Sequence, residues 1–181
     1  SAPQKGWSAS PAAGLVIMSE HAIETMADTS SSSFSIDLKK WFDIMTAYEN
    51  GGHAYHATMP TDALIRFRDI MLETKAYGFE KVKQEQWDLG NRARALIEGK
   101  GFKSVAGEGF KAPGVVVSYT DDPNIQNGKK FMEQGMQIAA GVPLQCDEPE
   151  DYRTFRLGLF GLDKLGDVDK AVDKLDTVLQ R

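Results

Sequence analysis

The spacing of apolar and charged positions is most regular at the end of the chain. Between residues 166 and 181 the apolar side chains fall on one helical stripe, and acidic residues occupy the first turn. This is the pattern of an amphipathic helix whose first-turn acids suit its N-terminal dipole. The stripe comprises Val168, Ala171, Val172, Leu175, Val178 and Leu179.

Short apolar segments separated by turn residues precede this helix. Four of them are strand candidates. The first two are rich in residues that favour strands, above all the run Val115–Val117 in the second. The predicted strands are residues 102–106, 114–120, 136–141 and 155–161. Residues 121–135 begin with acidic capping residues and a proline, which suits the first turn of a helix. After a charged helix that ends near Glu98, the predicted order is therefore β, β, α, β, β, α, a small α+β domain.

The first part of the chain has a different pattern. The continuous apolar run from Gly14 to Ser19 predicts a buried strand, and Ser19 is placed to cap a helix that follows it. Residues 29–37 form a polar loop that ends in Asp37, a second helix cap. The next helix carries a stripe that we expect to pack on a core. Its members are Leu38, Trp41, Phe42 and Met45.

Residues 50–62 contain two glycines, a proline and almost no apolar periodicity, which indicates a loop. Thr61 or Asp62 is expected to cap the helix that follows. Its predicted buried stripe comprises Leu64, Phe67, Met71 and Leu72.

Gly78 interrupts the helical pattern, and we place a domain boundary there. Residues 79–181 form the small α+β domain. Residues 1–78, one strand and three helices, read as the C-terminal end of a larger domain, because a buried strand needs sheet neighbours that this stretch does not supply.

Composition narrows the class of protein. The 181 residues are 41% hydrophobic and 26% charged, as in soluble globular proteins, and 21 basic against 26 acidic residues give a net charge of −5. Without a dense basic cluster, we expect no nucleic-acid partner. No apolar run approaches the roughly 20 residues that span a bilayer, and no signal peptide is evident, so we expect no membrane association and a cytoplasmic location.

The cysteine and histidine residues of this sequence do not indicate a metal site or a disulfide. The single cysteine, Cys146, excludes an internal disulfide framework, fits a reducing compartment, and is expected to be a small packing residue. His21, His53 and His56 lack the spacing of a metal site, so no metal is predicted.

Three stretches carry the candidate chemistry. They are "PQKG" with Lys5, "AYHATMPT" with Tyr55 and Thr58, and "FRLGLFG" with Arg156. Each has a plain structural interpretation. Lys5 could be a solvated charge near a terminus, Tyr55 an ordinary surface residue, and Arg156 an edge-strand arginine that reaches water.

Taken together and in this order, the three stretches resemble the C-terminal part of the class V, fold type I pyridoxal-phosphate (PLP) aminotransferases, in the alanine–glyoxylate and serine–pyruvate branch. The resemblance implies that Lys5 is the lysine that forms the Schiff base with PLP, with Gln4 beside the phosphate. It implies that Tyr55 and Thr58 bind the phosphate of the neighbouring subunit in a homodimer, and that Arg156 binds the substrate carboxylate.

These residue types suit that chemistry. A primary amine condenses reversibly with an aldehyde and, once released, can move a proton. The planar guanidinium fork pairs bidentately with a carboxylate, which a lysine cannot reproduce. The small residues around Lys5 allow close approach to a cofactor. Trp7 could line the substrate entrance or cover the core, and the sequence leaves this open.

In the family, most of the large domain precedes the lysine. It carries the phosphate loop, the ring stacked on the pyridine and the aspartate paired with the pyridine nitrogen, and none of these is found here. We therefore expect a C-terminal half, either a piece of a longer polypeptide or the partner of a separate chain with the N-terminal half. By itself it is expected to have little or no aminotransferase activity.

Two other functions remain open. The reaction implied by the resemblance moves an amino group from alanine or serine to glyoxylate or pyruvate, but class V transferases that act on phosphonate amines or pyridoxamine share most of these residues. A non-catalytic dimerisation or interaction module derived from such an enzyme is the alternative from another class. Such a module would have no use for both an aldehyde-reactive Lys5 and a carboxylate-binding Arg156.

Overall fold

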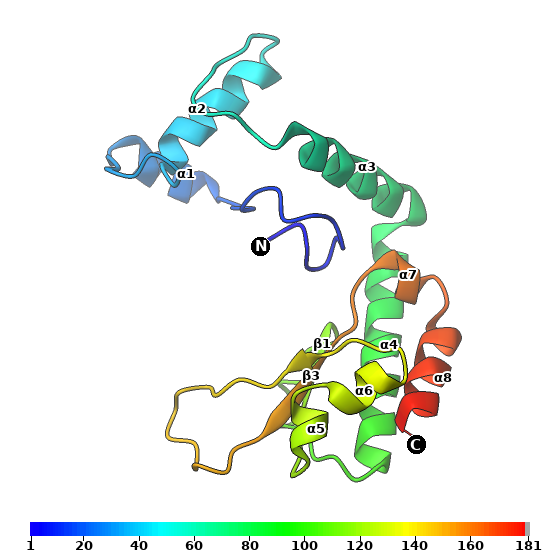
Figure 1. Ribbon diagram of the computed structural model, residues 1–181. Coiled ribbons are helices and arrows are strands. Elements are labelled where there is room, and N and C mark those ends of the chain that lie inside the picture. The colour runs from blue at the N-terminus through cyan, green and yellow to red at the C-terminus, as the bar shows by residue number, and fades with distance from the viewer. Residues whose placement is uncertain (180–181) are drawn as a thin grey trace.

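The structure, a computed structural model, describes residues 1–179. Its sheet has three antiparallel strands in the order β1, β3, β2 (Figure 1). They are β1 (Val115–Tyr119), β2 (Ala139–Ala140) and β3 (Thr154–Gly158). The strand predictions at 114–120, 136–141 and 155–161 are confirmed, although the middle one shrinks to two residues.

The helix α4 (Phe79–Gly99) packs against β1 of the sheet, and α8 (Val168–Leu179) packs against α4. The predicted stripe of α8 faces this core, with Leu175 fully buried; the last two residues of the predicted helix lie outside the described ones. The buried cluster comprises Leu89, Ala93, Ile97, Val116, Phe131, Phe155, Leu157, Leu159, Leu165 and Leu175. All of these belong to the predicted α+β part.

Two predictions in this part were wrong in detail. Residues 102–106 form no strand: Ser104 makes one isolated bridge to Ser118, while the buried guanidinium of Arg94 bonds to the Ser104 hydroxyl and to the Ala112 carbonyl. These bonds draw the segment onto α4. The predicted helix at 121–135 is split into α5 (Pro123–Gln126) and α6 (Lys129–Glu133), because Gly128 has a φ of 79° between them.

The first part is helical: α1 (Glu20–Ala27), α2 (Leu38–Glu49) and α3 (Thr61–Tyr77). Both predicted caps are confirmed, since Ser19 accepts a hydrogen bond from the Ala22 amide and Asp37 accepts one from the Lys40 amide. The cap predicted at Thr61 or Asp62 was wrong. Pro60 holds the capping position, and no side chain caps α3.

The buried strand predicted at residues 14–19 was also wrong. No strand within residues 1–179 pairs with this segment, and the side chains of Val16 and Ile17 are 57% and 95% exposed. The helical stripes are only partly covered for the same reason, a shortage of packing partners. On α2 and α3, the exposed stripe members are Leu38, Met45, Met71 and Leu72.

Gly78 ends α3 and begins α4 with a φ of 106°. Two contacts reach across this junction. The Tyr77 hydroxyl donates to the Glu85 carboxylate at 2.7 Å, and the Lys81 ammonium lies 4.2 Å from the centroid of the Tyr77 ring. The helix break expected at Gly78 is confirmed, whereas the division into two domains stays a prediction.

Among residues 1–179, no helix has both the length and the apolar composition needed to cross a membrane.

Candidate functional site

Lys5 lies in a tight turn near the N-terminus. The Lys5 amide donates to the Ala2 carbonyl, the Ser8 amide donates to the Lys5 carbonyl, and the Ala9 amide donates to the Pro3 carbonyl. Pro3 is fully buried under this turn. Lys5 and Gln4 are exposed, and the Lys5 ammonium makes no hydrogen bond or ion pair with residues 1–179. The turn therefore presents a free primary amine on an ordered backbone.

Two side chains tie this turn to the rest of the chain. The Trp7 ring packs edge-on against Phe67 of α3, with 5.8 Å between the ring centroids and an interplanar angle of 75°. Ser8 lies against Gly161, just beyond β3. Figure 1 shows the N-terminal loop lying between the first helices and the sheet. Trp7 thus packs on α3 through Phe67.

Arg156 lies in the middle of β3, opposite Val117 of β1 and Ala139 of β2. Its side chain is half-buried, and Nε donates to the Ala140 carbonyl at 2.8 Å. Neither terminal nitrogen makes a hydrogen bond or an ion pair within the part of the chain that the structure describes. One edge of the guanidinium is therefore fixed to the sheet, and the terminal nitrogens are left to bind an anion.

Tyr55 and Thr58 lie together in the loop before α3. The two hydroxyl oxygens are 3.2 Å apart, and the Tyr55 side chain is 77% exposed. Between them in sequence, His56 points the other way. Its Nε2 lies 2.8 Å from the Phe34 carbonyl oxygen, and its ring stacks at 4.2 Å from the Phe34 ring. His56 therefore anchors the loop, while Tyr55 and Thr58 face solvent as a pair.

The structure brings together the elements that carry Lys5 and Arg156, but it does not connect Tyr55 or Thr58 to either residue. The Lys5 turn contacts the segment that directly follows the strand of Arg156, so these two elements are linked through Ser8 and Gly161. Across residues 1–179, neither Tyr55 nor Thr58 hydrogen-bonds to Lys5 or Arg156.

The loop between β2 and β3 contains a turn whose backbone amides bind the carboxylate of Glu148. The Glu148 carboxylate accepts hydrogen bonds from the backbone amides of Leu144, Gln145 and Cys146, and the last two donate at 2.9 Å. Desolvation raises the pKa of Glu148, but its own backbone amide and then the amides of Cys146, Leu144 and Gln145 outweigh it and hold the pKa below its ordinary value. The loop leaves the sheet beside Ala140, the residue that holds Arg156.

Cys146 is exposed in this loop, so the expectation that it packs in the interior was wrong. Its amide serves the turn, and no tertiary packing covers its thiol. Within the described chain, no group of three or more histidine, cysteine or acidic side chains converges as metal ligands would.

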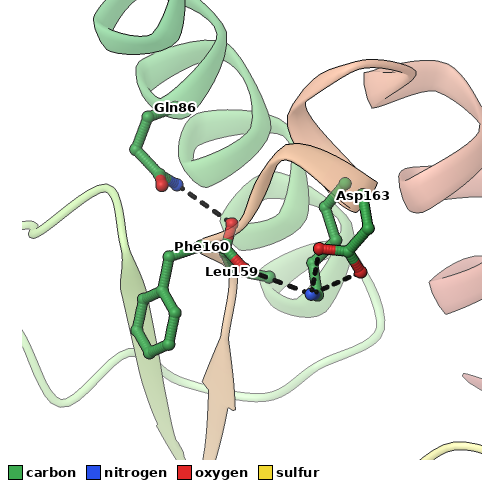
Figure 2. A network of polar contacts seen from close by, with 5 residues as sticks. Gln86, Leu159, Phe160 and Asp163 are labelled. Atoms are coloured by element: carbon green, nitrogen blue, oxygen red, sulfur yellow. Dashed lines mark hydrogen bonds and ion pairs between the residues drawn. The ribbon is translucent and has the colours of Figure 1, made fainter. Parts of the chain in front are cut away.

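The residues that seat the Lys5 turn were not predicted from the sequence. Gly161 meets Ser8 directly, and Gln86 of α4 holds the neighbouring backbone (Figure 2). The only local signal was the last glycine of "FRLGLFG", which the family pattern contains without giving it a role here. A contact between residues so far apart along the chain leaves no periodic trace.

No protein-family model matches this sequence, and no curated protein matches it. Solved structures do match. The alanine–glyoxylate aminotransferase from Nostoc sp. aligns over 98% of this chain with a TM-score of 0.75 and 19% identity. The ureidoglycine–glyoxylate aminotransferase from Bacillus subtilis aligns over 99% with a TM-score of 0.68 and 18% identity. An aspartate aminotransferase from Thermus thermophilus aligns over 90% with a TM-score of 0.63 and 17% identity.

These likenesses establish the fold. The chain has the fold of the C-terminal part of these aminotransferases, as the sequence resemblance implied. It spans 46%, 46% and 43% of the lengths of the three aminotransferases. At this level of identity the likeness alone does not carry over a substrate.

Proposed function

We propose that this chain supplies the lysine and the substrate-binding arginine of a PLP-dependent aminotransferase acting on small amino acids. The observation that carries the proposal is the docking of the Lys5 turn onto the segment that follows the strand of Arg156. The amine and the guanidinium are both left free to bind other groups. The aminotransferase fold of the neighbours supports the same conclusion.

The residues present fit the cofactor. When bound, PLP supplies an aldehyde and an electron-withdrawing ring that stabilises negative charge at the substrate α-carbon. The unpaired Lys5 amine fits the aldehyde, and after release it is placed to move a proton at the α-carbon. Gln4, beside it and exposed, is placed near the phosphate by the resemblance. Two neutral hydroxyls only 3.2 Å apart, those of Tyr55 and Thr58, suit phosphate oxygens.

Arg156 would orient the substrate. Its Nε is already bonded to the Ala140 carbonyl, which prevents rotation of the guanidinium plane. The terminal nitrogens can then form two parallel charge-assisted bonds with the substrate carboxylate.

We propose a homodimer in which Tyr55 and Thr58 reach the phosphate of the partner protomer. The exposed pair faces solvent and has no bond to Lys5 of its own chain, as a contribution to another subunit requires. The phosphate loop, the ring that stacks on the pyridine and the aspartate paired with its nitrogen would come from a large domain. These 181 residues alone are therefore proposed to have little aminotransferase activity.

Labelling tests the proposal. Pyridoxal phosphate is added to the purified chain, the adduct is reduced with borohydride, and modified peptides are mapped by mass spectrometry. An intact-mass scan for a companion chain accompanies the mapping. Where a companion chain completes the site, we expect label concentrated on Lys5, and the Lys5→Ala variant should lose that label while retaining background on surface lysines such as Lys39.

Uniform labelling of surface lysines, with Lys5 no more modified than Lys39 in the presence of a companion chain, would contradict the enzyme proposal. It would favour the non-catalytic interaction module instead. Phosphonate-amine and pyridoxamine transferase activities are separated from the proposed one by turnover with each amino donor once the complete enzyme is assembled.

A further inference from the structure

Gly161 is the point at which the Lys5 turn touches the α+β part of the chain. It is buried and has a φ of 109°. A Cβ placed here would lie 2.4 Å from the Ser8 hydroxyl oxygen, 3.3 Å from the Ser8 Cβ and 2.5 Å from a carboxylate oxygen of Asp163. The Ser8 hydroxyl and the Asp163 carboxylate would have to turn aside, and the Ser8 Cβ would have to move by a few tenths of an ångström. Glycine avoids both this crowding and the strain of the positive φ.

Side chains from α4 and from the helix that follows Gly161 hold the backbone on both sides of this residue. Gln86 of α4 donates to the carbonyls of Leu159 and Pro113, at 3.2 and 3.0 Å. The Lys164 ammonium donates to the Phe160 carbonyl at 3.1 Å and pairs with Asp163 at 3.0 Å (Figure 2). The backbone on both sides of Gly161 is therefore fixed to the core helix and to α7 (Leu162–Leu165). This segment is a rigid surface.

The Lys5 turn has a matching shape. Ser8 has a φ of 51°, an uncommon conformation for a residue other than glycine, and it lies where the turn meets Gly161. The hydrogen bonds from the amides of Ser8 and Ala9 close the turn directly behind Lys5. An unusual backbone conformation that persists is one that its surroundings hold in place.

We propose that Ser8 and Gly161 are positioning residues for Lys5: their contact seats the turn and sets where the amine is presented to the cofactor. The role assigned to Lys5 rests on the proposed function, whereas the contact itself does not. Displacing the turn at Gly161 should therefore misplace the amine without any change to Lys5.

Hydrogen exchange measures the contact directly. In the chain with Gly161→Ala, we expect the N-terminal peptide that contains Ser8 and Ala9 to exchange about tenfold faster than in the unchanged chain. Gly101→Ala is the matched control, because Gly101 also has a positive φ, 92°, but nothing lies within 4 Å of a Cβ placed there. It strains the backbone in a comparable way without crowding the Lys5 turn, so it should leave the N-terminal peptide unchanged.

A rescue separates positioning from a general loss of structure. Ser8→Gly removes both Ser8 atoms that crowd a Cβ at residue 161. The double variant, Ser8→Gly with Gly161→Ala, should recover slow exchange and the share of borohydride-trapped pyridoxal phosphate found on Lys5. If Gly161→Ala does not fold, Gln86→Leu is used in its place. This variant removes the hydrogen bonds to the Leu159 and Pro113 carbonyls, so it should also speed exchange of the N-terminal peptide.

The outcomes of the two proposals can be told apart. Unchanged exchange in both Gly161→Ala and Gln86→Leu, or equal acceleration in Gly101→Ala, would overturn the seating contact, even if Lys5 takes the label. Accelerated exchange that Ser8→Gly rescues supports the contact. If the unchanged chain, with a companion chain present, then takes no more label at Lys5 than at Lys39, the contact stands and the cofactor role of Lys5 fails.

Discussion

At the scale of single residues, Glu148 shows how one carboxylate organises a loop. It accepts hydrogen bonds from three consecutive amides, and the turn needs positive φ values of 62° at Gln145 and 63° at Asp147. The conformation costs energy that the charge-assisted bonds offset. The ordered loop then leads into the strand that carries Arg156.

This arrangement makes the loop sensitive to pH. Because the pKa of Glu148 in the folded chain lies below its ordinary value of 4.5, its bonds contribute fully above that value and are lost as the pH falls through the lowered pKa. We expect the amide NMR signals of Gln145 and Cys146 to titrate together, with a midpoint below 4.5.

Glu148→Gln should abolish that titration, whereas Glu150→Gln in the same loop should preserve it. A midpoint at or above the ordinary value would show that the amides do not hold the carboxylate in solution.

At the scale of elements, α4 contains two glycines with opposite surroundings. A Cβ at Gly90 would lie 2.5 Å from the Pro113 carbonyl oxygen and 2.7 Å from the Pro113 Cα, whereas nothing lies within 4 Å of one at Gly99. Gly90 therefore lets the helix approach the backbone before β1. Helix propensity favours alanine at both positions, but packing allows it only at Gly99.

We expect Gly90→Ala to lower the free energy of unfolding by about 1–3 kcal/mol, because Pro113 must move aside. Gly99→Ala should be neutral or stabilising by up to about 1 kcal/mol. Urea unfolding followed by circular dichroism measures both. Equal stabilisation by the two substitutions would show that α4 does not press on Pro113.

The elements that the sequence predicts well are those determined locally. Ser19 and Asp37 cap helices through bonds to amides three residues away, and the stripe of α8 depends only on helical spacing. Burial is not local. Ile97 is 0% exposed and Ile17 is 95% exposed, although both belong to apolar patterns. The strand predicted at 14–19 failed because its neighbours cannot be inferred from its own residues.

The candidate site likewise has residues that the sequence indicates and contacts that only the structure reveals. Lys5, Tyr55 and Arg156 were predicted as site residues because short motifs carry them in a recognisable order. The contact between Ser8 and Gly161, and the bonds of Gln86 beneath it, depend on the path of the whole chain, so only the structure reveals them.

At the scale of the whole molecule, the proposed homodimer makes a prediction about mixed subunits. In the assembled enzyme, a chain with Lys5→Ala is mixed with one carrying Tyr55→Phe and Thr58→Ala. If the hydroxyls serve the partner, each hybrid dimer has one site with Lys5 and both hydroxyls intact, and activity should rise above that of either variant alone. No rise on mixing, with hybrids verified by native mass spectrometry, would place the hydroxyls in the site of their own chain.

The bend at Gly78 has a mechanical consequence. At 1.5 Å per residue, α3 and α4 are levers of about 25 and 31 Å that meet at one glycine. The N-terminal loop connects the two helices. Trp7 packs on Phe67 of α3, and Ser8 contacts Gly161 in the segment that is hydrogen-bonded to α4. A change in the angle between α3 and α4 must therefore break one of these two contacts or move Lys5 together with the loop.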